Sequence, residues 1–177
     1  MSNHHRDPRL TPARGDIAAH FLKGHIAAKK YCQGTEYQLV HGLTTLHSHP
    51  DEKSSQLSQL LYGEHFMVYE IKNGWAWGQA LNDHYVGYCR ADALSPDLYP
   101  TTHHVTNLSS HIYPEPDPKS RPLGQVFMMS NVSVLNDVPV KGFVQLADGN
   151  WIYATHISNN FGADPVSEAL KFLYAPY

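Results

Sequence analysis

Apolar residues along this chain occur in short alternating or continuous segments, a pattern typical of β-strands rather than long helices. The densest stretch, residues 74–88, holds Trp75 and Trp77 two positions apart and then the turn pair Asn82-Asp83. This order predicts a β-hairpin of two aromatic-rich strands. Residues 60–70 before it are apolar on both faces, which predicts one strand of a small closed barrel.

The chain also matches itself, without gaps, at an offset of 66 residues. The aligned pairs are Pro50 with Pro116, Leu57 with Leu123, Phe66 with Val132, Val68 with Val134, Trp77 with Phe143, Gln79 with Gln145, Tyr85 with Trp151 and Val86 with Ile152. Apolar positions stay opposite apolar positions throughout, so we expect two copies of one small β-barrel, joined by residues 95–101. The pairing also predicts that Phe66 and Val68 face the core.

Two short helices are expected outside the repeats. Near the start, Asp16 precedes the apolar run 17–22, and Ile17 and Phe21 are predicted to share the face that docks on the barrel. Near the end, Asp164 and Pro165 are typical of a helix start. The apolar stripe of this second helix consists of Val166, Ala169, Leu170 and Leu173.

These elements predict a mainly β fold in four parts. Residues 1–38 form an N-terminal arm with the short helix, and residues 39–95 form the first barrel. Residues 102–158 form the second barrel, after a linker interrupted by two prolines. Residues 159–177 contain a further linker and the amphipathic helix.

Charge and composition exclude several classes of function. Thirteen Lys and Arg stand against 16 Asp and Glu with no basic run, so nucleic acid is not an expected partner. No apolar run reaches the roughly 18–20 residues needed to span a bilayer, and the first ten residues are polar, so neither a membrane partner nor a secretory signal is expected. Two isolated cysteines fit a reducing compartment. The expected location is cytoplasmic.

The sequence gives little indication of catalytic residues. The 13 histidines include the clusters His47-Ser48-His49 and His103-His104, but no H-E-x-x-H or Cys/His spacing, so we expect neither a metal nor a cofactor. Cys32 and Cys89 alternate with apolar residues, which predicts burial rather than nucleophilic catalysis. No catalytic residue is therefore assigned. A histidine-rich metal hydrolase stays an alternative that metal analysis of the purified protein would test.

Several short motifs occur together in a recognisable order. They are R-L-T-P-A-R at residues 9–14, L-L-Y-G-E at 60–64, G-W-A-W-G-Q at 74–79, D-H-Y-V-G-Y at 83–88 and A-L-K-F-L-Y-A-P-Y at 169–177. This order resembles the N-terminal half of bacterial NlpC-type cell-wall cysteine peptidases that carry two bacterial SH3-like domains before the catalytic domain. The resemblance implies two tandem SH3-like small β-barrels. Family members hydrolyse the γ-D-glutamyl–diamino acid bond of murein peptides.

The resemblance also implies a function. The family's catalytic cysteine and histidines have no matching positions here, so we expect the chain alone to be no enzyme. It would be the accessory half of such a peptidase, shaping the cleft for murein peptides with a free N-terminus. Implied contacts to substrate or partner are Glu64, Asp83 and Tyr85. Of the aromatic residues, most are expected in the core, and Trp75 and Trp77 are added as candidates for lining a groove.

The C-terminal stripe is the other implied contact. The resemblance implies that residues 159–177 are a linker and the start of a peptidase domain that is otherwise missing. Val166, Leu170 and Leu173 are expected to face that catalytic domain, either in the same chain, as in the relatives, or separately encoded. The alternative function is a free-standing SH3-like module that binds cell-wall peptide or a protein partner. An exposed apolar stripe favours the accessory half, because a self-sufficient module has no need of one.

Overall fold

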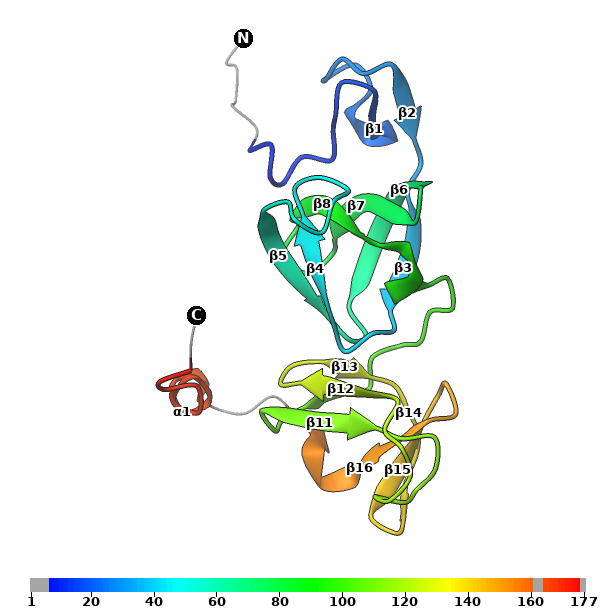
Figure 1. Cartoon of the computed structure of the whole chain (residues 1–177), viewed down its shortest axis with the longest axis vertical. Coiled ribbons are helices and arrows are strands. Elements are labelled where there is room, and N and C mark those ends of the chain that lie inside the picture. Colours follow the sequence, from blue (N-terminus) through cyan, green and yellow to red (C-terminus); the bar gives the residue numbers. More distant parts are fainter. Residues whose placement is uncertain (1–6, 161–163, 176–177) are drawn as a thin grey trace. The chain divides into compact units, whose positions relative to one another are not determined.

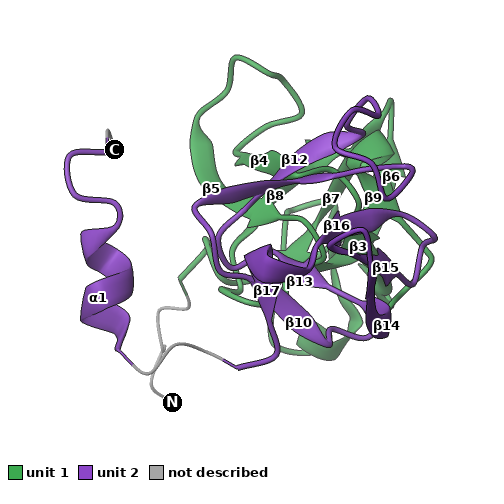
Figure 2. Cartoon of the chain, turned by 90° about the horizontal axis from the view of Figure 1, so that it is seen from below, with its two compact units in different colours: residues 1–99 green, residues 100–177 purple. Residues whose placement is uncertain are grey.

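The structure is a computed structural model that describes residues 7–160 and 164–175 (Figure 1). The chain forms two compact units, residues 1–99 and residues 100–177, which Figure 2 colours separately. Strands dominate both units, so the predicted mainly β fold is confirmed. None of the helices in the described part of the chain is long and apolar enough to cross a membrane.

Unit 1 is built on a seven-stranded antiparallel sheet in the order β5-β4-β8-β7-β6-β3-β9. Its strands are β3 (Thr35–Leu39), β4 (Leu43–His47), β5 (Gln56–Leu61), β6 (His65–Lys72), β7 (Trp75–Ala80), β8 (Val86–Arg90) and β9 (Leu94–Ser95). β7 and β8 pair with Trp77 opposite Tyr88, which confirms the predicted aromatic hairpin. A short 3-10 turn, η2 (Ala91–Ala93), leads from β8 into β9.

The single strand predicted over residues 60–70 is wrong. β5 ends at Leu61, β6 begins at His65, and Gly63 makes the turn between them with a φ of +78°. That conformation suits glycine because it has no Cβ. The run is apolar on both faces because it contributes to two strands that lie apart in the sheet. The predicted barrel does not close either, because β5 and β9 are both edge strands of the described sheet.

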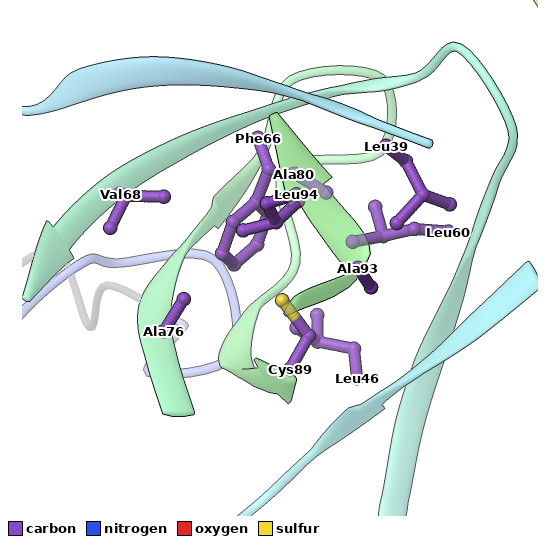
Figure 3. Packing of buried hydrophobic residues seen from close by; sticks show 10 residues of the cluster. All are labelled: Leu39, Leu46, Leu60, Phe66, Val68, Ala76, Ala80, Cys89, Ala93 and Leu94. Carbon is purple, nitrogen blue, oxygen red and sulfur yellow. The ribbon is translucent and has the colours of Figure 1, made fainter. Parts of the chain in front are cut away.

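One face of this sheet carries the main core of unit 1 (Figure 3). It consists of Leu39, Leu46, Leu60, Phe66, Val68, Ala76, Ala80, Cys89, Ala93 and Leu94. Phe66 is fully buried and Val68 is 5% exposed, which confirms the predicted facing of β6. Burying such large apolar side chains contributes roughly 1.5–3 kcal/mol each, so this face supplies much of the stability of unit 1.

The N-terminal segment covers Trp77 and forms a second cluster, here called the outer cluster. Its buried members are Ile17, Ala18, Ala19, Leu22, Tyr69, Trp77 and Val86. The segment contains β1 (Ile17–Ala19), the 3-10 turn η1 (His20–Leu22) and β2 (Lys30–Cys32), and β1 pairs with β2 in parallel. Unit 1 therefore has apolar layers on both sides of β7.

The helix predicted over residues 17–22 is wrong except for its last turn. Ile17, Ala18 and Ala19 are all buried. A surface helix would bury only one stripe of its residues, whereas a strand enclosed by neighbours can bury consecutive residues. Pairing with β2 satisfies their backbone groups instead. Phe21, expected on the docking face with Ile17, is 65% exposed. β2 does not pair with β3, the next strand (Thr35–Leu39), which pairs instead with β6 and β9.

Gln38 fixes the end of unit 1. Its side chain is 6% exposed, and its Nε2 donates to the carbonyl of Gly63 at 3.0 Å. The same amide binds both backbone groups of Tyr99: Nε2 donates to the carbonyl at 3.1 Å, and Oε1 accepts from the backbone N–H at 2.9 Å. These hydrogen bonds satisfy the buried Gln38 amide and hold Tyr99 against β3.

Unit 2 consists of smaller sheets. Its strands are β10 (His103–Val105), β11 (Ser109–Ile112), β12 (Gly124–Phe127), β13 (Asn131–Val132), β14 (Val134–Val140), β15 (Phe143–Leu146), β16 (Trp151–Tyr153) and β17 (Ile157–Ser158), with the 3-10 turn η3 (Ala154–His156) before the last. β10 lies between β13 and β17, β11 pairs with β12, and β14, β15 and β16 follow one another. Val132, Phe143 and Ile152 are at most 1% exposed and form its interior.

The C-terminal helix begins as predicted. α1 (Pro165–Leu170) has Pro165 at its first position, and Asp164 Oδ1 accepts from the backbone N–H of Val166 at 3.0 Å. Val166, Leu170 and Leu173 are 64%, 59% and 61% exposed. Their expected contact with a catalytic domain stays a prediction.

Substituting Gly78 should destabilise unit 1. A Cβ at this position in β7 would collide with the carbonyl oxygen of Met67 and lie 2.6 Å from Phe66 Cε1. Overpacking of this kind costs about 3 kcal/mol, and Gly78→Ala should lose that much in denaturant unfolding. Gly15→Ala is the control, since a Cβ there meets nothing within 4 Å. Equal stability of the two variants would contradict this account of the packing.

Candidate functional site

Two turns at one end of the unit 1 sheet bring together Glu64, Asp83 and Tyr85, here called the turn cluster. Glu64 lies between β5 and β6, where its Oε2 accepts from the backbone N–H of Leu61 at 2.9 Å. Its Oε1 accepts from Asn82 Nδ2 at 3.2 Å, which links this turn to the β7–β8 turn. The three residues that the family resemblance implied therefore lie close together in the fold.

Asp83 organises the second turn. Its Oδ1 accepts from the backbone N–H of Tyr85 at 3.0 Å, and its Oδ2 accepts from Ser58 Oγ at 2.7 Å. The half-buried Tyr85 packs against the main core. Both carboxylates are thus fixed by hydrogen bonds, and the Tyr85 side chain is fixed by packing.

The electrostatics of the turn cluster favour a cationic ligand. Burial raises the pKa of Glu64, the negative charge of Asp83 raises it further, and hydrogen bonds from Leu61 and Asn82 only partly oppose this. No Lys, Arg or His of the described residues forms an ion pair with Glu64. A half-buried carboxylate without a cation gains most when an ammonium group approaches it.

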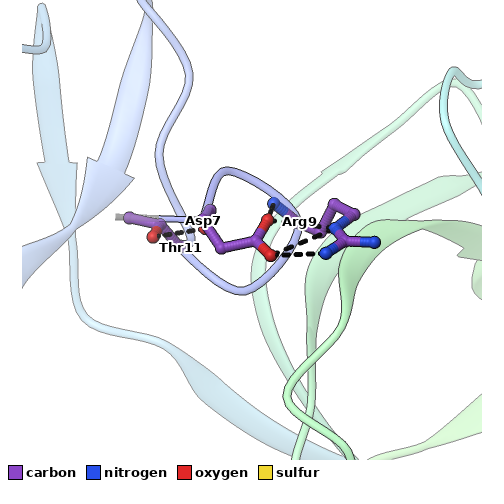
Figure 4. Close-up of polar contacts among 3 residues, drawn as sticks. All are labelled: Asp7, Arg9 and Thr11. Carbon is purple, nitrogen blue, oxygen red and sulfur yellow. Dashed lines mark hydrogen bonds and ion pairs between the residues drawn. The ribbon is translucent and has the colours of Figure 1, made fainter. Parts of the chain in front are cut away.

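The N-terminal arm runs beside this site. Arg9 binds the carboxylate of Asp7, and Thr11 Oγ1 donates to the Asp7 carbonyl at 2.8 Å, so residues 7–11 form a closed turn (Figure 4). The Arg9 carbonyl accepts from the backbone N–H of Val86 at 2.8 Å. Gln79 Nε2 donates to the Leu10 carbonyl at 2.9 Å. These bonds attach the arm to β7 and β8 next to Tyr85.

Trp75 and Trp77 lie elsewhere, in what we call the aromatic pocket. This cavity of about 470 Å³ is lined by Arg14, Asp16, Pro50, Glu70, Lys72, Asn73, Trp75, Trp77 and Tyr88. The two tryptophans are only 8% and 3% exposed, so they belong mainly to the interior and each lines the pocket with a small part of its surface. The five residues predicted as binding residues thus divide between two places.

Arg14 is the functional candidate that sequence reasoning missed. Its Nη2 donates to Glu70 at 2.5 Å and to Asp16 at 2.9 Å, and its Nη1 donates to Tyr88 Oη at 2.7 Å. Its Cζ lies 4.4 Å from the centroid of the Trp77 ring. Burial acts to lower the pKa of Arg14, but the hydrogen bonds to Asp16 and Glu70 outweigh it and raise the pKa. The sequence holds no local signal for this, because Glu70 is 56 positions away.

The two cysteines lie in unsuitable places for nucleophiles. Cys89 is fully buried in the main core, and burial raises the pKa of its thiol to about 12, with Asp92 adding to the effect. Cys32 is half-buried, and its Sγ donates to the Gln33 carbonyl at 3.2 Å. Within the described residues, no group of three or more His, Cys, Asp or Glu side chains is arranged to hold a metal ion.

Comparison with known proteins identifies the sheet that carries both sites. Residues 46–94 match the family model of the bacterial dipeptidyl-peptidase SH3 domain. The matched segment contains both turns of the turn cluster and the β7–β8 hairpin. No curated protein sequence matches the chain.

One solved structure shows a related fold. An NlpC/P60 family protein from Bacillus cereus superposes with a TM-score of 0.55 at 14% identity, covering 70% of this chain and 55% of that one. NlpC2 and NlpC1 from Trichomonas vaginalis give TM-scores of 0.31 and 0.32 at 19% and 15% identity, covering 81% and 94% of this chain. The chain spans about half the length of these structures, 55–56%. Residues 46–94 of unit 1 are thus similar to the SH3 domain of bacterial dipeptidyl-peptidases.

Removing Arg14 should destabilise unit 1. Arg14→Ala leaves Glu70 and the Tyr88 hydroxyl without their partner and uncovers the Trp77 ring, which should cost about 2–3 kcal/mol in denaturant unfolding. Arg9→Ala is the matched control, because the Arg9–Asp7 pair is largely exposed and screened by solvent, so its loss should change stability little. Equal losses in the two variants would show that Arg14 is only a surface residue.

Glu64→Gln should show a pH-dependent gain. Because the pKa of Glu64 is raised on folding, the ionised carboxylate costs stability at neutral pH, and this cost disappears as the pH falls through the raised pKa. The variant should therefore be as stable as the parent or more so at pH 7, by up to about 1 kcal/mol, with no gain below about pH 4. The exposed Glu115→Gln should change nothing at either pH. A clear loss of stability for Glu64→Gln at pH 7 would be the opposite result.

Proposed function

We propose that this chain supplies the SH3-like accessory part of an NlpC/P60-type peptidase, and that its turn cluster contacts the amino-terminal end of a peptide. The observation that carries the proposal is the half-buried Glu64, which forms no ion pair with the described residues and lies within the segment that matches the dipeptidyl-peptidase SH3 domain. A peptidase that releases dipeptides must recognise a free amino terminus, and a fixed carboxylate recognises an ammonium group.

The geometry of the turn cluster supports this role. Glu64 Oε1 has one hydrogen bond, from Asn82, so it can accept another from an ammonium N–H. Asp83 adds negative charge beside it, and the Tyr85 side chain is held against the core. Because the bonds from Leu61, Asn82 and Ser58 fix these groups in advance, a ligand loses little free energy in ordering them.

We further propose that unit 2 is a second SH3-like domain. The order of strand pairing supports it: β10 lies between β13 and β17 as β3 lies between β6 and β9, and β11 pairs with β12 as β4 pairs with β5. At the 66-residue offset, Ser130, Gly149 and Trp151 occupy the positions of Glu64, Asp83 and Tyr85. Unit 2 therefore carries no carboxylate at these positions, and we assign peptide recognition to unit 1.

The bond cleaved by the complete peptidase is part of the same proposal. We propose the γ-D-glutamyl–diamino acid bond of murein peptides, with this chain helping to shape the cleft that receives them. No catalytic role is assigned to Cys89, because its buried thiol with a pKa of about 12 is not a thiolate at neutral pH.

Binding of L-Ala-γ-D-Glu-diaminopimelate to the purified chain tests the proposal. The peptide with a free amino terminus should bind with a Kd on the order of 1 mM, and the same peptide acetylated at its amino terminus should bind at least about fivefold more weakly. Amide resonances of Leu61, Asn82 and Tyr85 in nuclear magnetic resonance spectra should report the binding.

Two variants complete the experiment. Glu64→Gln should bind both peptides equally weakly, whereas Glu115→Gln in unit 2 should behave as the parent. If the acetylated and free peptides bind equally to the parent chain, or if Glu64→Gln retains the preference, Glu64 does not recognise the amino terminus.

A further inference from the structure

The aromatic pocket combines rings with carboxylates. Trp75, Trp77 and Tyr88 supply the rings, and Asp16 and Glu70 supply the carboxylates. Its volume of about 470 Å³ falls within the range of roughly 300–1,000 Å³ found for ligand sites. Rings with adjacent carboxylates are the combination that binds cations in proteins.

The chain's own arginines already use these rings. The Arg14 Cζ lies 4.4 Å from the Trp77 centroid and 5.6 Å from the Tyr88 centroid. Arg90 Cζ lies 5.3 Å from the centroid of Trp75. Each ring that lines the pocket therefore has a guanidinium group beside it, which shows that this wall suits cations.

The carboxylates leave one acceptor open. Both oxygens of Asp16 accept from Arg14, whereas Glu70 accepts from Arg14 through Oε2 alone. Glu70 Oε1 accepts no hydrogen bond that the described residues provide. Arg14 with these two carboxylates carries one surplus negative charge. Since the Glu70 side chain is 32% exposed, a ligand can reach it while water is partly excluded.

Two lining residues, Arg14 and Lys72, are themselves cationic. Arg14 is paired with Asp16 and Glu70, so the lining cation that opposes a further positive charge is Lys72. It lies at the exposed end of β6, where solvent and salt screen its charge. Glu70 is held in place by Arg14, whereas no ion pair fixes Lys72 among the described residues. The fixed, partly desolvated charge of the pocket is therefore the carboxylate of Glu70.

We propose that the aromatic pocket binds an arginine or lysine side chain of a peptide partner, with the cationic head group on Glu70 Oε1 and the aliphatic stem against Trp75. Long cationic side chains suit such a site because their methylene stems pack on apolar surface while the head group binds a carboxylate. This site involves different residues from the turn cluster and does not depend on the proposed recognition of an amino terminus.

Titration of the full chain with Nα-acetyl-arginine amide tests the proposal. In nuclear magnetic resonance spectra, the indole N–H signals of Trp75 and Trp77 should shift saturably, with a Kd on the order of 1–10 mM. The indole signal of Trp151 in unit 2 should not move and serves as an internal control. Nα-acetyl-lysine amide should give the same pattern, and Nα-acetyl-norleucine amide, which lacks the charge, should bind at least about fivefold more weakly.

Two variants separate the charges of the pocket. Glu70→Gln should weaken binding of the arginine probe about fivefold or more, and Lys72→Gln should strengthen it about twofold. Because Lys72 is exposed, its variant should fold normally and keeps the test informative if Glu70→Gln unfolds. The proposal is wrong if norleucine amide binds as well as arginine amide, if Nα-acetyl-glutamate amide binds better, or if Lys72→Gln weakens binding.

Discussion

Strand β7 is buried on both faces, and the rest of unit 1 depends on this constraint. Ala76 and Ala80 face the main core with Phe66, while Trp77 faces the outer cluster. A strand of this kind needs an apolar layer on each side, because burying a tryptophan side chain stabilises the fold and exposing it to water would lose that stabilisation. The main core is supplied by the sheet itself, and the second layer comes from the N-terminal segment.

This need explains why Arg14 has so many partners. Residues 17–22 bury Trp77 from one side, and Arg14 covers its ring while binding Glu70, Asp16 and Tyr88. The matched segment, residues 46–94, contains neither Arg14 nor the outer cluster residues of β1. Unit 1 is therefore larger than the segment that matches the SH3 family model. The aromatic pocket arises at the join between the two.

Local features of the sequence predicted local structure well. The spacing of Trp75 and Trp77 with the Asn82-Asp83 turn predicted the hairpin, and Asp164 predicted the start of α1. The errors arose where distant residues decide the outcome. Residues 17–19 look helical in isolation. They form a strand because they pair in parallel with residues 30–32 and because all three are buried. Likewise, residues 60–70 read as one apolar strand in the sequence, but the turn at Gly63 divides them between β5 and β6.

The candidate sites show the same division. Motif order indicated Glu64, Asp83 and Tyr85, although nothing in their spacing showed that two separate turns would be joined through Asn82. Arg14 and Glu70 could not be paired from sequence, because their contact depends on how the arm crosses the sheet.

The bonds between Gln38 and Tyr99 bear on how unit 1 reaches its native state. Hairpins such as β6–β7 and β7–β8 can form early, since their partners are near neighbours in the chain. β3 pairs with β6 on one side, whereas its other side is completed by β9 and by the bonds from Gln38 to Tyr99, 61 positions later in the chain. Closing so long a loop is entropically costly, so this edge of the sheet belongs to the late part of folding. On the ribosome, the side of β3 that faces β9 therefore stays unpaired until residues up to Tyr99 have emerged.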